Sequence, residues 1–266
     1  MNVFRGSAHL RAAPPCALTI GNFDGVHRGH HALLQALTEG ARARGLASCV
    51  MTFEPHPKEF FTPAEAPPRI LNLRDKLAAF ADVGIDRVVI ERFNAAYSKL
   101  TPEQFVSEIL IRRLNTKWIL IGDDFCYGAK RAGDFASLKR AGEEFGFEVS
   151  NINTVLENQE RISSSALRSA LAEGDMPKAA LLLGRPYLIS GHVIYGRQIG
   201  RTLGFPTLNL AVANHLHERK PAMTGIFTVL VHGLGDTPLP GVASLGVRPT
   251  VEDAVSYTHL TLPTKA

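Results

Sequence analysis

The sequence predicts an α/β domain built on a parallel sheet, followed by a smaller antiparallel β domain. Three observations support this prediction. Strand-like and helix-like segments alternate from residue 16 to residue 152. A Gly-rich polar loop at residues 21–31 lies between an apolar run and a helical pattern. After residues 184–186, Gly-Arg-Pro, only short β-type runs with many glycines occur.

Composition and charge describe an ordinary globular protein of 266 residues, 45% hydrophobic and 20% charged. The net charge of +4 suits anionic substrates as well as it suits a solvated surface, and there is no Lys/Arg-rich run of the kind that binds nucleic acid. The three cysteines, Cys16, Cys49 and Cys126, are far apart and favour a reducing compartment. Without a signal peptide or a membrane-length apolar run, we expect a cytoplasmic protein with no membrane partner.

The first unit of the α/β domain consists of a strand at residues 16–20, the loop 21–31 and a helix with Leu33, Leu34 and Leu37 on its apolar face. This order of segments, in which a short apolar run is followed by Gly-rich residues and then a helix, is typical of a nucleotide-binding site. Residues 21–31, Gly-Asn-Phe-Asp-Gly-Val-His-Arg-Gly-His-His, are called the histidine loop.

The histidine loop carries two histidines three residues apart, His27 and His30, which would share one face of a helix N-terminus. Gly29 between them leaves room for a ligand. Unpaired N–H groups and a partial positive charge at that end suit phosphate, and imidazoles there can stabilise its charge as a bond breaks. For either histidine alone, a helix cap or a half-buried surface residue is the favoured interpretation, whereas the pair with its glycines favours function.

The remaining elements of the first domain follow in order. Thr101 is expected to cap a helix that has Pro102 at its first position and Gln104 completing a capping box. Strands are predicted at residues 47–53, 87–91, 117–121 and 147–152, and helices at 72–83, 102–114 and 135–145.

Two further strand ends carry unusual residues, and ligands of parallel sheets bind at strand carboxyl ends. Residues 52–57, Thr-Phe-Glu-Pro-His-Pro, contain Pro55 and Pro57, which suit a rigid wall for a planar ligand or simply a stiff loop. Residues 122–128, Gly-Asp-Asp-Phe-Cys-Tyr-Gly, have two carboxylates and two aromatic rings between glycines. This pattern suits either a contact with a nucleotide or an ordinary turn.

A third motif, residues 161–168, reads Arg-Ile-Ser-Ser-Ser-Ala-Leu-Arg and opens a short helix. Serines there offer caps beside free N–H groups, and Arg161 and Arg168 can hold phosphate oxygens in a planar fork. A plain serine cap with two surface arginines is the alternative, but serine and arginine point to the same anionic ligand.

The second domain begins after a helical segment at residues 175–183 and has β-type runs at 187–195, 225–231 and 242–247. Residues 196–209, Gly-Arg-Gln-Ile-Gly-Arg-Thr-Leu-Gly-Phe-Pro-Thr-Leu-Asn, form a Gly-rich stretch. Its glycines permit close approach of phosphate, and Thr207 and Asn209 provide oxygen ligands for a hard cation such as Mg²⁺. Alone, the loop is a weak signal.

Together the ordered motifs resemble the bacterial bifunctional riboflavin kinase/FAD synthetase family. The resemblance rests on the histidine loop and on residues 52–57, 122–128, 161–168 and 200–209, and it covers residues 1 to 253. It implies a Rossmann-like nucleotidylyltransferase domain that joins ATP and FMN into FAD and pyrophosphate. It also implies a flavokinase β-barrel that phosphorylates riboflavin to FMN.

The resemblance assigns roles to residues of this chain. His27 and His30 match the His-x-Gly-His pair that handles the ATP phosphates, and with Arg168 they are the predicted catalytic residues. The predicted ATP and phosphate contacts are Gly21, Phe23, Asp24, Gly25, Gly29, Asp124, Arg161, Ser163, Ser164 and Ser165. Pro55 and Pro57 are predicted to bind flavin. The predicted kinase nucleotide contacts are Gly196, Gly200, Gly204 and Pro206, and the metal ligands are Thr207 and Asn209.

The chemistry agrees with these residue types. The FMN phosphate is the nucleophile and is anionic at pH 7, so no protein base is needed to activate it. Catalysis then consists of positioning plus stabilisation of charge on the α-phosphate and the departing pyrophosphate. The substrates implied are ATP, FMN and riboflavin, with Mg²⁺ as the cofactor; self-association is left open.

The end of the sequence departs from the family. No match is found beyond residues 246–251 for the later strands, or for the Glu that serves as base toward the riboflavin hydroxyl. Residues 255–266 look foreign, since they resemble translated sequencing-adapter DNA; a divergent natural tail is the alternative. We therefore expect domains at 1–184 and 185–254, a non-native tail at 255–266, an incomplete barrel and a defective kinase.

The sequence leaves other functions as alternatives. Aminoacyl-tRNA synthetases use a similar histidine loop, but residues 161–168 lack the lysine that their second motif requires. Another His-x-Gly-His nucleotidylyltransferase is a further alternative. A non-catalytic flavin- or nucleotide-binding module would not need both histidines together with Arg168.

Overall fold

The computed structural model describes residues 1–8, 10, 13–152, 156–157, 160–194, 207–211, 221–247 and 256–261. The chain forms two compact units. The first comprises Met1–Pro67 and Lys76–Ile162, and the second comprises Pro68–Asp75 and Ser163–Ala266. That an early segment, Pro68–Asp75, belongs with the later part of the chain was not expected from the sequence. The domain limits expected at 1–184, 185–254 and 255–266 stay a prediction.

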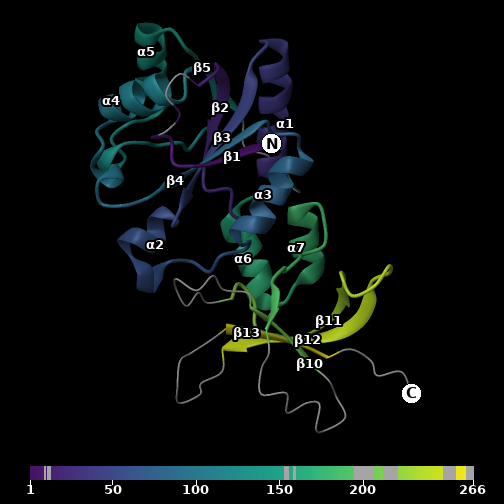
Figure 1. The fold of residues 1–266 in the computed structure, drawn as a ribbon. Helices are drawn as coiled ribbons and strands as arrows, with labels where there is room; N and C mark the ends of the chain where they lie inside the picture. Colours follow the sequence, from purple (N-terminus) through teal and green to yellow (C-terminus); the bar gives the residue numbers. More distant parts are fainter. Residues whose placement is uncertain are drawn as a thin grey trace. The chain divides into compact units, whose positions relative to one another are not determined.

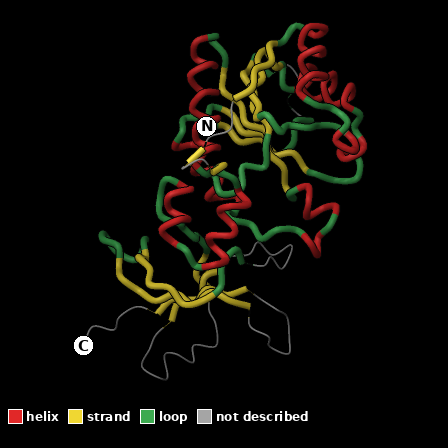
Figure 2. Tube along the Cα trace, turned by 180° about the vertical axis from the view of Figure 1, so that it is seen from behind, coloured by secondary structure: helices red, strands yellow, loops and turns green. Residues whose placement is uncertain are grey.

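The first unit is built on a six-stranded, wholly parallel sheet in the order β1-β4-β3-β2-β5-β6 (Figures 1 and 2). From β2 the chain proceeds through β3 to β4 on one side, and then through β5 to β6 on the other. The strand order therefore reverses between β2 and β5, which is where open α/β sheets bind ligands. The strands are β1 (Asn2–Arg5), β2 (Cys16–Ile20), β3 (Ala47–Glu54), β4 (Arg87–Arg92), β5 (Thr116–Gly122) and β6 (Glu148–Ile152).

Helices cover both faces of this sheet (Figure 2). The Thr101 capping box predicted from the sequence is confirmed: its hydroxyl accepts from the Gln104 N–H, and the Gln104 side chain accepts from the Thr101 N–H. The helical segments are α1 (Arg28–Ala43), α2 (Pro57–Phe61), the 3₁₀ turns Pro63–Glu65, Tyr97–Lys99 and Ala129–Arg131, α3 (Leu73–Asp82), α4 (Pro102–Gln104), the π-helical Phe105–Arg113 and α5 (Phe135–Phe145).

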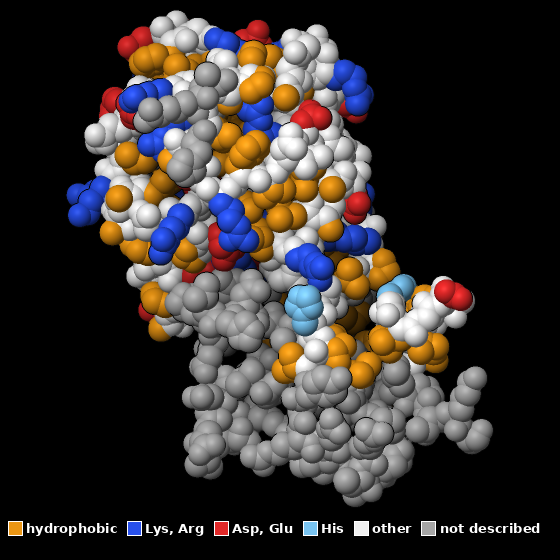
Figure 3. Space-filling view, viewed as in Figure 1, with side chains coloured by type: hydrophobic (Ala, Val, Ile, Leu, Met, Phe, Trp, Pro, Cys, Tyr) orange, Lys and Arg blue, Asp and Glu red, His pale blue; other side chains and the backbone are white. Residues whose placement is uncertain are grey.

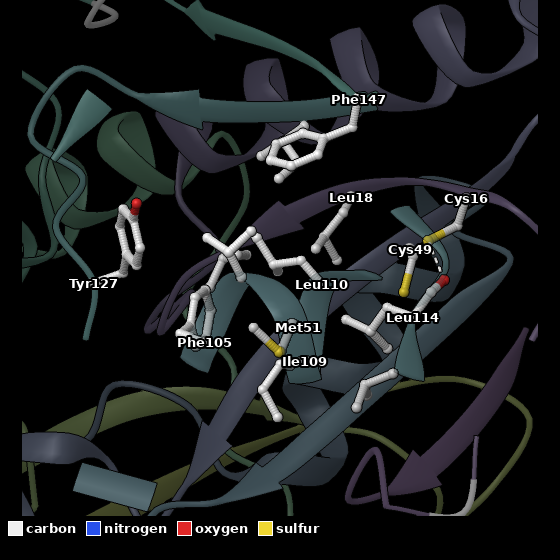
Figure 4. Close-up of a cluster of buried hydrophobic side chains, with 14 of the residues drawn as sticks. Cys16, Leu18, Cys49, Met51, Phe105, Ile109, Leu110, Leu114, Tyr127 and Phe147 are labelled. Carbon is white, nitrogen blue, oxygen red and sulfur yellow. Dashed lines mark hydrogen bonds between the residues drawn. The ribbon is translucent and has the colours of Figure 1, made fainter. Parts of the chain in front are cut away.

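One hydrophobic core lies between the sheet and the π-helical segment (Figure 4). Successive strand residues point to opposite faces, so Cys16 and Leu18 of β2 enter this core together with Cys49 and Met51 of β3. Phe105, a residue of the π-helical segment, packs against them. These strands are buried on both faces, as a parallel sheet requires, and they place their polar loops at one edge.

The second unit combines two helices with a five-stranded antiparallel sheet in the order β11-β12-β13-β10-β9. The Tyr187 hydroxyl donates to the Ile70 carbonyl at 3.0 Å, which ties residues 68–75 to this unit. Its elements are α6 (Ser164–Glu173), α7 (Met176–Leu183), β9 (His192–Ile194), β10 (Thr207–Ala211), β11 (Gly225–Val231), β12 (Leu239–Val247) and β13 (Ser256–Thr261). The predicted fold class, a parallel α/β sheet followed by antiparallel strands, is confirmed.

Several elements differ from the sequence-based expectation. β1 and α2 were not predicted, and only residues 192–194 of the expected strand 187–195 are described as a strand. β13 lies inside the stretch expected to be a foreign tail, and it pairs with β12 on one side and β10 on the other. The foreign origin of residues 255–266 stays a prediction.

Charged side chains are dispersed over the face seen in Figure 3, where the Lys and Arg of the described residues alternate with Asp and Glu. Within the described part of the chain, no helix is long and apolar enough to cross a membrane.

Candidate active site

The histidine loop leaves the carboxyl end of β2 and runs into α1 with an unusual backbone. Phe23 (φ 49°) and Val26 (φ 40°) adopt left-handed conformations that non-glycine residues avoid, and Gly25 (φ 88°) lies between them. Two donors meet the Asn22 carbonyl: Lys76 Nζ at 2.8 Å and the Thr52 hydroxyl at 3.4 Å. Backbone of this kind persists only where its surroundings hold it, and such strain is concentrated at functional sites.

His27 and His30 lie together at the start of α1. His27 is the N-cap residue, and its Nδ1 accepts the backbone N–H of His30 at 3.3 Å. The two imidazole rings stack, with centroids 3.7 Å apart and planes 14° apart. Because Nδ1 of His27 is an acceptor, the neutral ring carries its proton on Nε2.

Burial keeps both imidazoles neutral. Desolvation lowers the pKa of His27 to about 4, and the nearby Asp24 carboxylate only partly opposes this shift. The pKa of His30 lies well below its usual value, first because of burial and then because of His27, Lys76 and His31. The pair therefore meets an anion at pH 7 as neutral hydrogen-bonding groups. Within the described part of the chain, the buried His30 Nδ1 has no hydrogen-bond partner.

Gly29 packs closely against the His27 ring. A Cβ at this position would lie 3.2 Å from His27 Nδ1 and 3.5 Å from the Ile162 carbonyl. The sequence-based reason for this glycine was room for a ligand; the structure adds packing against the His27 ring.

Phe23 and Asp24, both predicted nucleotide contacts, are buried. The Phe23 ring meets His30 edge-on at 5.1 Å and Phe80 at 5.4 Å. Phe23 therefore packs against one ring of the histidine pair, and its predicted contact with nucleotide stays a prediction, as does that of Gly21.

Asp124 and Arg161, predicted as separate nucleotide contacts, form an ion pair in the first unit, with Arg161 Nη2 2.6 Å from Asp124 Oδ2. About half of the Arg161 side chain and more than half of Asp124 remain exposed. The pair joins the loop after β5 to the residues just before the three serines at 163–165, which are called here the serine motif. An anion that binds Arg161 therefore competes with Asp124 for it.

The serine motif opens α6 in the second unit. The Ser163 hydroxyl accepts the Ala166 N–H at 3.1 Å, so it acts as the N-cap. Arg168 Nε donates to the Pro68 carbonyl at 2.9 Å. The phosphate-binding roles of Ser163, Ser164, Ser165 and Arg168 stay predictions.

Pro55 and Pro57 follow β3, where Glu54–Pro55 is a cis peptide bond and Pro57 begins α2. Beside them lies a feature that sequence reasoning missed. Five aromatic rings contact one another edge-on or tilted at 5.2–5.8 Å, and they are called here the aromatic cluster: Phe53, Phe60, Phe61, Phe93 and Tyr97. Phe61 is 62% exposed. The only sequence signal for the cluster was the run of phenylalanines around Pro55 and Pro57.

The predicted kinase residues are only partly described. Gly196, Gly200, Gly204 and Pro206 lie outside the described residues, and Thr207 begins β10. Asn209 in the same strand is 8% exposed, and its buried Oδ1 has no hydrogen-bond partner among the described residues. An orphaned amide oxygen suits a hard cation such as Mg²⁺. Among the same described ranges, no group of three or more His, Cys, Asp or Glu side chains is arranged to hold a metal.

Two family models match separate stretches of the chain: FAD synthetase over residues 10–166 and riboflavin kinase over residues 183–262. Similar curated proteins are named bifunctional riboflavin kinase/FMN adenylyltransferase. The Escherichia coli K12 protein is 47% identical, over 94% of this chain and 80% of its own length. The Pseudomonas fluorescens protein is 44% identical over 94% and 79%, and the Haemophilus influenzae protein is 40% identical over 98% and 84%.

A solved structure is also similar: the Streptococcus pneumoniae protein described as a macrolide-efflux protein. It superposes with a TM-score of 0.77 at 25% identity, covering 98% of this chain and 83% of its own.

Proposed function

The chain belongs to the bifunctional riboflavin kinase/FMN adenylyltransferase family, and we propose that the stacked histidines of the histidine loop carry its adenylyl transfer. Its function is FAD biosynthesis: AMP passes from ATP to FMN, giving FAD and pyrophosphate, and the kinase domain belongs to the step from riboflavin to FMN. The observation that carries the proposal is the stacked imidazole pair at the N-terminus of α1, beside the reversal point of the sheet.

Adenylyl transfer makes one bond and breaks one. An FMN phosphate oxygen attacks the α-phosphorus of ATP, and the bond from that phosphorus to the oxygen bridging to the β-phosphate breaks, releasing pyrophosphate. The His27 Nε2–H donates to a phosphate oxygen, and the N–H groups at the start of α1 add to it. Hydrogen-bond donors suit this step because negative charge moves toward the leaving group. The donors can be neutral and need not act as bases, because no proton has to be removed from FMN.

A further phosphate contact in the first unit would come from Arg161. Arginine forks suit the triphosphate, and Arg161 is released to it when the anion displaces Asp124. Mg²⁺ bound with ATP would neutralise phosphate charge. The protein's own groups then hold the α-phosphate in line with the FMN oxygen. This positioning supplies most of the rate acceleration that charge stabilisation does not.

The flavin ring would lie against Pro55, Pro57 and the aromatic cluster. This cluster lies at the carboxyl ends of β3 and β4 and in the segments that follow them, and Phe61 presents an exposed ring. An isoalloxazine ring is planar and apolar on its faces, so stacked or edge-on aromatic contacts suit it.

On the kinase side, Thr207 and Asn209 would hold Mg²⁺ with ATP. The orphaned Asn209 Oδ1 supports this assignment.

The direct test is chromatography of FAD after incubation of the protein with ATP, Mg²⁺ and FMN. FAD and pyrophosphate formed in equal amounts support the proposal. Flavin and ATP binding without FAD would instead identify a binding module. Formation of aminoacyl-tRNA by the chain, with FMN unconsumed, would favour a synthetase.

A further inference from the structure

Lys76 of α3 is a buried cation, and the adenylyl-transfer step proposed above gives it no role. Lys76 is 2% exposed, although lysine is among the residues least often buried. Its Nζ donates to the Asn22 carbonyl at 2.8 Å, within the histidine loop. Ordering a long side chain and desolvating its charge is costly, so a contact of this kind points to a specific task.

The carbonyl that Lys76 holds controls a strained torsion. The Asn22 C=O and the Phe23 N–H belong to one peptide plane, so its orientation sets φ of Phe23. That φ is 49°, in the left-handed region, and a non-glycine residue needs outside contacts to stay there. Lys76 supplies the shorter of the two hydrogen bonds to this carbonyl, and Thr52 supplies the longer.

The strained residue in turn supports the histidines. The Phe23 ring contacts His30 at 5.1 Å, and His30 stacks on His27. Phe80 lies one turn after Lys76 on the same buried face of α3 and contacts Phe23 at 5.4 Å. One face of α3 therefore holds both the peptide and the ring on which the histidine pair rests.

We propose that Lys76 is a positioning residue for adenylyl transfer, which acts on the histidine pair through the Asn22–Phe23 peptide and the Phe23 ring. The proposal rests on the function assigned above to His27 and His30. Losing the Lys76 ammonium releases the Asn22 carbonyl, which misplaces His30 and slows the chemical step. Substrate binding is retained, because in this proposal Lys76 does not contact ATP or FMN.

The test compares Lys76→Met with Arg74→Met, which removes an exposed cation from the same helix. Lys76→Met should lower kcat for FAD formation ~10- to 100-fold, with KM for ATP and FMN within about threefold. Arg74→Met should leave kcat unchanged. Thermal unfolding and near-ultraviolet circular dichroism show whether each variant is folded.

A double-mutant cycle with His30→Ala separates positioning from plain stability. If Lys76 acts through His30, Lys76→Met costs less than about threefold once His30 is gone. Radiolabelled ATP keeps the slow variants measurable. If Lys76→Met does not fold, Lys76→Gln takes its place in the same cycle.

Three results would overturn the inference while leaving the proposed function intact: full kcat in a folded Lys76 variant, equal losses with and without His30, or a rise of tenfold or more in KM for ATP. The last would make Lys76 a direct phosphate contact. Absence of FAD formation by the unsubstituted protein is the separate result that would overturn the proposed function itself.

Discussion

The protonation of His27 links catalysis to stability at the scale of single residues. Its pKa in the folded protein is about 4, below the usual 6.5, because the ring is buried. Between these values the unfolded chain binds more protons than the folded chain does, so the free energy of unfolding falls as the pH drops from 6.5 toward 4. His27 alone accounts for up to about 3 kcal/mol of this loss.

His27→Asn should flatten that pH dependence, because Asn retains an N-cap acceptor and has no proton to bind. Urea unfolding of both proteins at pH 7 and pH 4.5 measures the difference. His192→Gln, which removes an exposed histidine of β9, is the matched control and should keep the slope of the parent. An equal slope for His27→Asn and the parent would contradict the buried neutral state.

His30 is the residue whose loss should be most visible in the reaction. His30→Ala removes an imidazole stacked on His27 and should lower adenylyl transfer ~10²–10³-fold, the scale of losing one stabilising group at a developing charge. Steady-state FAD formation measures it, with His192→Ala as the control. A near-normal rate in the folded variant would exclude the proposed role.

At the scale of elements, one glycine of α1 sets how closely that helix approaches β5. A Cβ on Gly40 would lie 2.3 Å from the Trp118 ring. Glycine to alanine normally stabilises a helix by ~1 kcal/mol, but here overpacking should win and Gly40→Ala should destabilise the protein by ~1–3 kcal/mol.

Trp118 is the only tryptophan of the chain, so its fluorescence reports this contact directly. The emission of Gly40→Ala should shift while its urea midpoint falls. Gln35→Ala, an exposed substitution in α1, should change neither. A rise in stability for Gly40→Ala would show that the helix can move away at no cost.

The α2 segment contributes the exposed ring of the aromatic cluster. Phe61→Ala should raise KM for FMN ~10-fold, with KM for ATP within about twofold, because only the flavin is expected to contact this ring. Phe145→Ala, which removes another exposed phenylalanine from α5, is the matched control. A loss of ATP affinity instead would place the nucleotide at this cluster.

Elements with strong local signals were predictable. The Thr101 capping box and the buried β2 run carry their information within a few residues. β1 was missed because its four residues, most of them exposed, have no clear period. α2 was missed because Pro57 and the preceding Pro55 also suit an extended loop. The long-range ring contacts of the aromatic cluster join residues 32 to 44 positions apart, and the Lys76 contact joins residues 54 apart, so only the fold brings them together.

At the scale of the whole molecule, the two reactions belong to separate stretches of the chain, since the family models match residues 10–166 and 183–262 without overlap. Each reaction should therefore be lost on its own. His30→Ala should lower FAD formation from supplied FMN and leave phosphorylation of riboflavin at the level of the unsubstituted chain. Asn209→Ala should leave FAD formation from supplied FMN unchanged.

Both substitutions can be read in one chromatogram that separates riboflavin, FMN and FAD. Supplying FMN isolates the adenylyl transfer, and supplying riboflavin with ATP reports the kinase through the FMN that is formed. Asn209→Ala should lower any FMN formed, because Asn209 would lose its cation ligand. If Asn209→Ala also loses FAD formation from supplied FMN, the two sites are coupled. Asn209 could then not be assigned to the kinase reaction alone.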